Sequence, residues 1–212
     1  DRFVSATSIF SSGTSVDWLR AMLTPGADPQ AFMDLAARAP AGANGLIFVP
    51  TLGGGTSFEG GPDVRGGMVG LDLGHSPADL ARAALEGVAL GLRAALGALQ
   101  DLCPVSDEIL VTGGGAQSPL WRQIFADAFA RRIVKSRIDR QASTLGAAAL
   151  GLIGLGIWPD ASRIRQLHQP EAEALPGPDA AMLERAFAAY QAAAADMRDL
   201  APLLTPLRHR AP

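Results

Sequence analysis

Residues 109–130, ILVTGGGAQSPLWRQIFADAFA, constrain the fold more than any other stretch of this chain. The β-branched run 109–112 predicts a strand that stops at Gly113–Gly115, and a helix is expected from Pro119 with Ser118 as its N-cap. Glycines between a strand and a helix N-terminus bring bare backbone N–H groups close to an anion or a flat ring. Alone, the pattern is equally compatible with close packing and with ligand binding.

A second unit of the same design stands at the start of the chain. Residues 2–12, RFVSATSIFSS, combine β-branched and aromatic residues with small polar ones and predict a strand. Gly13 follows, and Thr14 or Ser15 is expected to cap a short helix over 16–23. The sequence thus contains two strand–glycine–helix units.

The middle of the chain contains a strand, a loop and a long helix. The wholly apolar run 45–50 predicts a short buried strand, and 51–67, with seven glycines and no periodicity, predicts a loop. Loops of this length within a domain are commonly functional or mobile. Ser76 is expected to cap a long helix that runs to about Leu102, with Glu86 on a solvated face.

The second half continues the alternation of strands and helices. A short strand is expected over 132–135 and a small-residue helix over 143–153. The Pro-, Gly- and acid-rich stretch 171–178 is typical of a connection, and 179–200 predicts an Ala-rich helix. We expect the basic, Pro-containing tail 205–212 to fray.

Composition excludes several classes of protein. The 212 residues are 48% hydrophobic and 18% charged with a net charge of −3, which argues against disorder and against nucleic-acid or anionic-membrane partners. The single cysteine, Cys103, excludes an internal disulfide framework or a Cys-rich zinc site. No apolar run reaches about 18 residues, so no membrane span is predicted, and no signal peptide is recognised. Because the chain starts at Asp1, in an expected strand and without Met, we expect the C-terminal part of a longer protein.

Sequence motifs for metal-dependent hydrolysis and for Ser-His catalysis are absent. His75, His168 and His209 are scattered without HExxH or triad spacing, and there is no Walker A lysine loop. We therefore expect no metal-binding residues in this chain.

Six segments, in this order and at these intervals, carry a resemblance to a known family. They span residues 11–158, and they read SSGTSVDWLRAML, GLIFVPTLGG, PDVRGGMVGL, HSPADLARAALEGVALGLR, EILVTGGGAQSPLWRQIFADAF and STLGAAALGLIGLGIW. Together they resemble the C-terminal domain of the FGGY carbohydrate kinases, most closely the xylulokinase branch.

The resemblance implies an α/β domain with the actin-like ATPase, ribonuclease-H-like fold: a central mixed sheet flanked by helices. The implied organisation is a single C-terminal nucleotide-binding domain over 1–212, with a core over about 3–158 and a C-terminal helical extension over about 159–212. An N-terminal sugar-binding domain is implied outside this chain.

The resemblance also assigns candidate ATP-binding residues. In the family, the glycine turn lies beside the adenosine and phosphates, which implies these roles for Gly113 and Gly114, with Gly115 adjacent. The family's polar contact to the adenine falls on Ser118.

The first strand–glycine–helix unit supplies two further candidate contacts, Gly13 and Asp17, although glutamine or asparagine is more familiar at the latter position. The resemblance implies Mg²⁺ bridging the phosphates. The family's catalytic aspartate belongs to the N-terminal domain, so no catalytic residue is expected here.

The implied reaction is transfer of the ATP γ-phosphate to a hydroxyl of a small sugar, a ketopentose such as D-xylulose. Glycerol, ribulose or another polyol remains an alternative substrate, because Gly60 and Gly61 stand where the family usually has Trp-Asp. An actin-like module that binds nucleotide without transferring phosphate is an alternative of another class. The implied partners are the N-terminal domain, the sugar or polyol and a second copy of the protein, in the cytoplasm.

Overall fold

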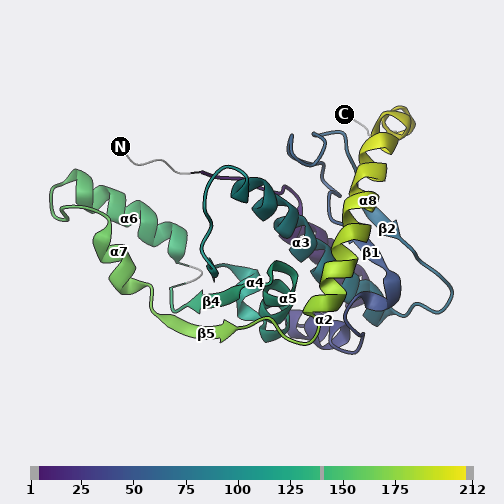
Figure 1. Ribbon diagram of the computed structural model, residues 1–212, viewed down its shortest axis with the longest axis horizontal. Helices are drawn as coiled ribbons and strands as arrows, with labels where there is room; N and C mark the ends of the chain where they lie inside the picture. The colour runs from purple at the N-terminus through teal and green to yellow at the C-terminus, as the bar shows by residue number, and fades with distance from the viewer. Residues whose placement is uncertain (1–4, 139–140, 209–212) are drawn as a thin grey trace.

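The computed structural model describes residues 5–138 and 141–208. One long helix, α3 (Pro77–Gln100), forms the centre of the assembly (Figure 1). The elements packed against it are α1 (Ser12–Leu23), α2 (Pro29–Ala36), η1 (Ala43–Gly45), β1 (Ile47–Val49), α5 (Pro119–Phe129) and α8 (Ala180–Leu204). The described core is therefore built around one helix rather than around one sheet face.

Helix α3 begins where its capping signals predict. The Asp79 carboxylate accepts hydrogen bonds from the backbone N–H of Ser76 at 2.8 Å and from the Ser76 hydroxyl at 2.7 Å. The Asn44 side-chain amide donates a third bond at 2.7 Å. Because hydrogen bonds from Ser76, and then from Asn44, favour the ionised carboxylate, they lower the pKa of Asp79 below its ordinary value.

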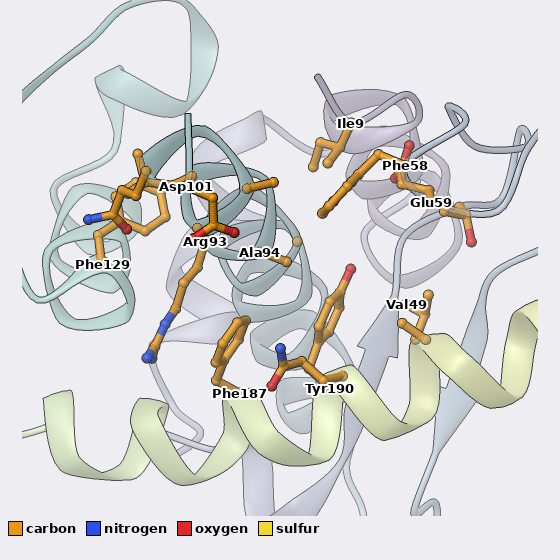
Figure 2. A pocket seen from close by; sticks show the side chains of 18 of the residues that line it. Ile9, Val49, Phe58, Glu59, Arg93, Ala94, Asp101, Phe129, Phe187 and Tyr190 are labelled. Carbon is orange, nitrogen blue, oxygen red and sulfur yellow. The ribbon is translucent and has the colours of Figure 1, made fainter. Parts of the chain in front are cut away.

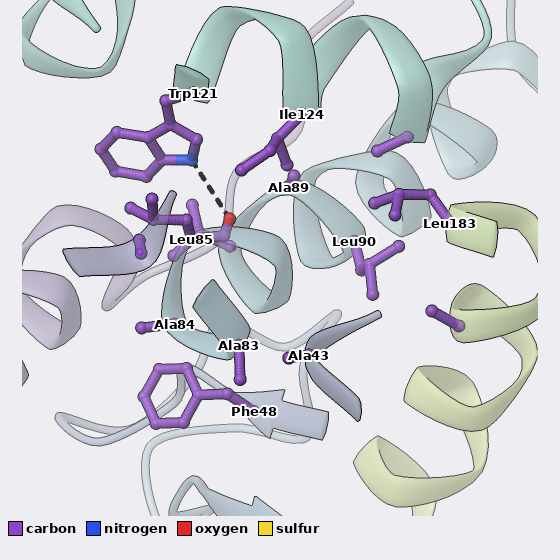
Figure 3. Close-up of a cluster of buried hydrophobic side chains, with 14 of the residues drawn as sticks. Ala43, Phe48, Ala83, Ala84, Leu85, Ala89, Leu90, Trp121, Ile124 and Leu183 are labelled. Atoms are coloured by element: carbon purple, nitrogen blue, oxygen red, sulfur yellow. Dashed lines mark hydrogen bonds between the residues drawn. The ribbon is translucent and has the colours of Figure 1, made fainter. Parts of the chain in front are cut away.

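Small residues let α3 lie directly on strand β1. A Cβ built at Gly87 would stand 2.1 Å from the carbonyl oxygen of Phe48, so only glycine fits this approach. Farther along the core, Trp121 of α5 packs against the same helix, and its Nε1 donates to the carbonyl oxygen of Leu85 at 3.1 Å (Figure 3). Helix α3 thus connects β1 to α5.

The strands form two small sheets. Strand β1 pairs antiparallel with β2 (Gly67–Val69). In the second sheet, β3 (Glu108–Val111) runs parallel to β4 (Arg132–Ser136), and β5 (Pro170–Ala174) runs antiparallel to β4. The second sheet is mixed and has α5 packed against β4 and β5, in agreement with the predicted fold class.

Strand β5 corrects the prediction of a connection over 171–178. Its sequence, PEAEA, has no β-branched residue and no local strand signal. Contacts with β4 stabilise this strand. Lys135 Nζ of β4 lies 2.6 Å from the Glu171 carboxylate of β5, and Arg132 Nε of β4 donates to Glu173 at 3.0 Å. Tertiary pairing therefore overrides the local composition.

The prediction of a strand over 2–12 is wrong where the structure describes it, because residues 5–9 have no regular secondary structure; residues 1–4 lie outside the described part. A loop, not a strand, contacts this segment, since the Phe10 N–H donates to Glu59 Oε2 at 2.9 Å. The helix also begins early: α1 starts at Ser12, so Gly13 lies in its first turn. Ser15 is not the cap, because its hydroxyl donates to the carbonyl of Pro50.

The remaining helices follow the sheet. Helix α6 (Ala142–Gly154) confirms the predicted small-residue helix, whereas α7 (Ser162–Leu167) was not predicted; both extend away from the main body (Figure 1). Helix α8 leads into a short 3-10 turn, η2 (Thr205–Leu207), and the tail prediction over 209–212 falls outside the described residues. Among the helices described, none combines the length and apolarity needed to cross a membrane.

Candidate functional site

The glycine turn after β3 presents an open backbone. Gly113 has φ +87°, a conformation that favours glycine, and Gly114 begins a short helix, α4 (Gly114–Gln117), which the sequence did not predict. A Cβ built at Gly113 or Gly114 would meet no atom within 4 Å. At Gly115 it would lie 3.4 Å from the rings of Trp121 and Phe125. The first two glycines therefore border open space, and the third faces the core.

The far side of the turn is fixed by side chains of α5. The Ser118 hydroxyl oxygen accepts from the Trp121 N–H at 3.3 Å, which confirms Ser118 as an N-cap. Arg122 Nη1 donates to the carbonyl of Gln117 at 3.1 Å and also bonds the carbonyl of Ala116. Sequence reasoning missed Arg122, although its place four residues after the cap puts its side chain over the preceding turn. The turn is thus rigid on one side and open on the other.

Ser118 is buried, with 7% of its surface exposed. Its hydroxyl uses an acceptor position in the cap, and a hydroxyl keeps one proton to donate. A hydrogen bond from Ser118 to an adenine is chemically compatible with the cap, and this contact stays a prediction.

Gly13 and Asp17 lie on the exposed side of α1. A Cβ at Gly13 would meet no atom within 4 Å, and the Asp17 carboxylate, one turn later, pairs with Arg20 Nε at 3.3 Å. Both α1 and α5 pack against α3, so the two predicted contact groups are carried by neighbours of one helix. Nucleotide contact by Gly13 and Asp17 stays a prediction.

A shallow hollow of about 380 Å³ lies beside α1, and sequence reasoning missed it. Its lining includes Trp18, which is 51% exposed, and Leu52 of the following loop. Trp18 is the residue after Asp17. The hollow therefore offers an aromatic and an aliphatic wall next to the predicted contacts of α1.

Glu86 does not lie on a solvated face, as the sequence predicted, but is buried with 3% of its surface exposed. Its carboxylate pairs with Arg82 one turn earlier and accepts from the Gly42 N–H at 3.1 and 3.2 Å. Burial raises the pKa of Glu86, and Arg82 opposes that rise. This pair holds α3 against the turn before η1, which gives Glu86 a structural explanation.

Mg²⁺ has no evident protein ligand set here. Within residues 5–138 and 141–208, no group of three or more His, Cys, Asp or Glu side chains is arranged to hold a metal ion. A nucleotide fits the open glycine turn better than a metal ion does, because the turn presents backbone N–H groups rather than oxygen ligands.

The mixed sheet and its strand–glycine–helix unit define the class, an α/β domain with the actin-like ATPase fold, which solved sugar kinases share. A xylulose kinase from Lactobacillus acidophilus, crystallised with ligand, superposes with a TM-score of 0.78 at 34% sequence identity. The match covers 87% of this chain and 38% of that one. The family model described as the FGGY family of carbohydrate kinases, C-terminal domain, matches residues 1–155. This chain belongs to the FGGY family of carbohydrate kinases.

The curated relatives of this chain are named as kinases of different substrates. A xylulose kinase from Staphylococcus epidermidis is 31% identical over 156 residues, covering 74% of this chain and 31% of the relative. A gluconokinase from Bacillus subtilis is 39% identical over 134 residues, covering 62% of this chain and 26% of the relative. The chain thus spans about a third or less of the length of these relatives.

Proposed function

We propose that this chain is the ATP-binding domain of a kinase that transfers the γ-phosphate to a hydroxyl of a small sugar. The open backbone at Gly113 and Gly114 carries the proposal. It stands between a strand end and a helix N-terminus, where N–H groups and the helix dipole favour anions. Membership of the FGGY carbohydrate kinases supports the same reading.

Phosphoryl transfer depends on positioning and on charge neutralisation more than on covalent help from the protein. In the proposed complex, Gly113–Gly115 lie beside the nucleotide, Ser118 donates to the adenine, and Gly13 and Asp17 contact it from α1. Bound Mg²⁺ would neutralise charge on the phosphates, and we assign no residue of this chain as its ligand. The aspartate that accepts the proton of the sugar hydroxyl is proposed to lie in the preceding domain.

The proposed sugar is a ketopentose such as D-xylulose. Similarity to xylulose kinases in sequence and structure supports this choice. Glycerol, ribulose or another polyol remains the alternative, and similarity to a gluconokinase adds a sugar acid to the candidates. A coupled ATPase screen of the full-length protein against ketoses, polyols and gluconate tests the choice, and stimulation by a substrate other than D-xylulose would replace it.

A nucleotide-binding module without phosphoryl transfer is the second candidate. The domain that precedes this chain distinguishes the two functions. In a kinase, that domain carries an aspartate positioned to act as the general base. Under the kinase proposal, the partners are that domain, the sugar and a second copy of the protein, and the setting is cytoplasmic. Absence of sugar-stimulated ATP hydrolysis despite ATP binding would favour the module.

The glycine turn is tested by Gly114→Val. Since a Cβ at this position meets no protein atom within 4 Å, the variant is expected to fold and to obstruct only the approach of the nucleotide. We expect Mg·ATP affinity to fall at least about tenfold by calorimetry on the full-length protein.

Gly97→Val is the matched control, because Gly97 also has no atom within 4 Å of a built Cβ but lies in the last turns of α3. It should leave affinity for ATP unchanged. Equal affinities in Gly114→Val and wild type would show that the turn is structural.

A further inference from the structure

A second cavity, of about 780 Å³, lies between α3, α8 and the loop that follows β1 (Figure 2). None of the residues proposed to contact the nucleotide lines it. Its volume falls in the range of small-molecule sites, which combine apolar walls with a few polar groups. The proposed kinase reaction gives this cavity no role.

The hydroxyl of Tyr190 points into this cavity from α8 (Figure 2). Tyr190 is 5% exposed. No hydrogen bond of its hydroxyl is found among the residues that the structure describes. Burial, with the nearby Glu59 carboxylate, raises the pKa of Tyr190, so the group stays a neutral donor and acceptor. Because the hydroxyl faces the cavity, it is free to form a hydrogen bond with a bound ligand.

Gly91 of α3 leaves space for the Tyr190 hydroxyl. A Cβ at Gly91 would stand 2.8 Å from Tyr190 Oη, so the absence of a side chain there lets the tyrosine reach the cavity wall. Thr51, 3% exposed, is a second lining residue whose hydroxyl oxygen has no partner among the described residues. The inner wall thus carries two hydroxyls with unused hydrogen-bonding capacity.

Most charged groups around the cavity already have partners. Arg93 bonds Glu184 at 2.6 Å and stacks over Phe187, and Arg131 bonds Asp107 at 2.7 Å. Glu59 Oε2 accepts from two backbone N–H groups, those of Phe10 and Thr56, both at 2.9 Å.

Arg198 and Asp101 are the exceptions, since neither has an ion pair within the described residues. The position of Arg198 is given by its neighbours. Arg198 lies close enough to Tyr190 to lower the tyrosine's pKa, and its side-chain stem rests against Gly60, where a Cβ would meet it at 2.5 Å. The Asp101 carboxylate lies beside Phe129, across the cavity from Glu59, whose neighbour Gly60 contacts Arg198 (Figure 2). An anionic group in direct contact with the Arg198 guanidinium would therefore be favoured, whereas one beside Asp101 or the Glu59 carboxylate would be disfavoured.

We propose that this cavity binds a small aromatic carboxylate. Its ring lies among Ile9, Phe58 and Ala94, which line the space facing Tyr190 (Figure 2). Its carboxylate lies between the Tyr190 hydroxyl and the Arg198 guanidinium, which both donate hydrogen bonds to it.

The experiment uses a ligand pair and the full-length protein saturated with Mg·ATP. Calorimetric titration with 3-phenylpropionate is compared with 3-phenylpropanamide, which has the same ring and no charge. We expect the acid to bind at least about threefold more tightly, because only the acid forms an ion pair with Arg198, whereas the amide oxygen accepts as a neutral group.

Two substitutions then test the assigned contacts. Tyr190→Phe removes the hydroxyl but keeps the ring, and Arg198→Gln removes the charge; each is expected to weaken 3-phenylpropionate binding at least about threefold. Arg185→Gln is the control, because Arg185 is an exposed arginine of α8 that does not line the cavity. It should leave the affinity unchanged.

The preference of wild type for the acid is independent of whether any variant folds. Absence of 3-phenylpropionate binding, equal binding of the amide, or unchanged affinity in either Tyr190→Phe or Arg198→Gln would overturn the proposal. Competition between 3-phenylpropionate and Mg·ATP would also overturn it, by placing the ligand in the nucleotide site. Failure of ATP binding itself would instead count against the proposed kinase function.

Discussion

Adjacent residues of the glycine turn have different environments. Gly113 and Gly114 border open space, whereas Gly115, the next residue, faces Trp121 and Phe125. A run of three identical residues therefore contains two different environments. Sequence reasoning identified the run and its Ser118 cap, but the division within it depends on the rings that α5 places below.

Ser118→Ala tests whether one hydroxyl serves both the cap and the nucleotide. Loss of the bond to the Trp121 N–H should lower the free energy of unfolding by about 1 kcal/mol. If the hydroxyl also donates to the adenine, Mg·ATP affinity falls as well, by about threefold to tenfold. Urea unfolding and calorimetry measure the two effects separately, and a loss of stability with unchanged affinity would leave Ser118 as a cap only.

The prediction that Glu86 lies on a solvated helix face was wrong because of a distant contact. A glutamate in a helix is ordinarily solvated, but Glu86 is enclosed because the turn at Gly42 lies directly over it. The contact joins residues 44 positions apart, and a helical periodicity carries no information about such a neighbour.

Elements whose ends are set by local chemistry were predicted well. Helix α3 begins at Pro77 after its Ser76 cap, and α5 begins at Pro119 after Ser118. Elements that depend on distant pairing were not: residues 5–9 have strand-forming residues and no strand, whereas β5 forms from PEAEA because β4 lies beside it. Local signals thus predicted the starts of α3 and α5 but not that of α1, which begins at Ser12, before its expected cap. Tertiary contacts decide weak strands.

The N-terminus of α3 gives a pH-dependent prediction. Asp79→Asn should lower the free energy of unfolding by about 1–2 kcal/mol at pH 7, because a neutral amide replaces a carboxylate that accepts three hydrogen bonds. Since the folded-state pKa of Asp79 is lowered, its stabilisation is complete above the unfolded-state pKa of about 3.9. It is lost as pH falls through the folded-state value.

The difference between wild type and Asp79→Asn should therefore shrink as the pH falls below about 4. Urea unfolding followed by circular dichroism at a series of pH values measures this difference. Asp63→Asn, at an exposed loop position, serves as the control for general charge effects. A difference that stays constant from pH 7 down to pH 2 would contradict the assignment.

At the scale of the whole molecule, the part that extends from the body leaves large apolar side chains exposed. Helix α6 has one buried residue, Ala149, whereas Leu150, and Leu155 just beyond the helix, are 72% and 77% exposed. Exposed apolar helices are commonly covered by another part of an assembly. Because the chain spans 31% of the xylulose kinase relative, we propose that the rest of the full-length protein covers α6.

This organisation predicts that the 212 residues alone are an incomplete enzyme. We expect them to bind Mg·ATP weakly and to phosphorylate no sugar, because the proposed base belongs to the preceding domain. A coupled assay with D-xylulose and a calorimetric ATP titration test both statements, with the full-length protein as the positive control. Robust sugar phosphorylation by the 212-residue chain would contradict the assignment of the base to another domain.

The hydrogen bond from Trp121 to Leu85 has an optical consequence. Its indole is 7% exposed, stands under Gly115 and is bonded to the backbone of the central helix. A shift of the glycine turn against that helix would change the surroundings of a natural fluorophore. The other tryptophans, Trp18 and Trp158, lie on α1 and after α6, so replacing both with Phe would isolate this emission. The domain therefore carries its own spectroscopic reporter at the junction of turn and core.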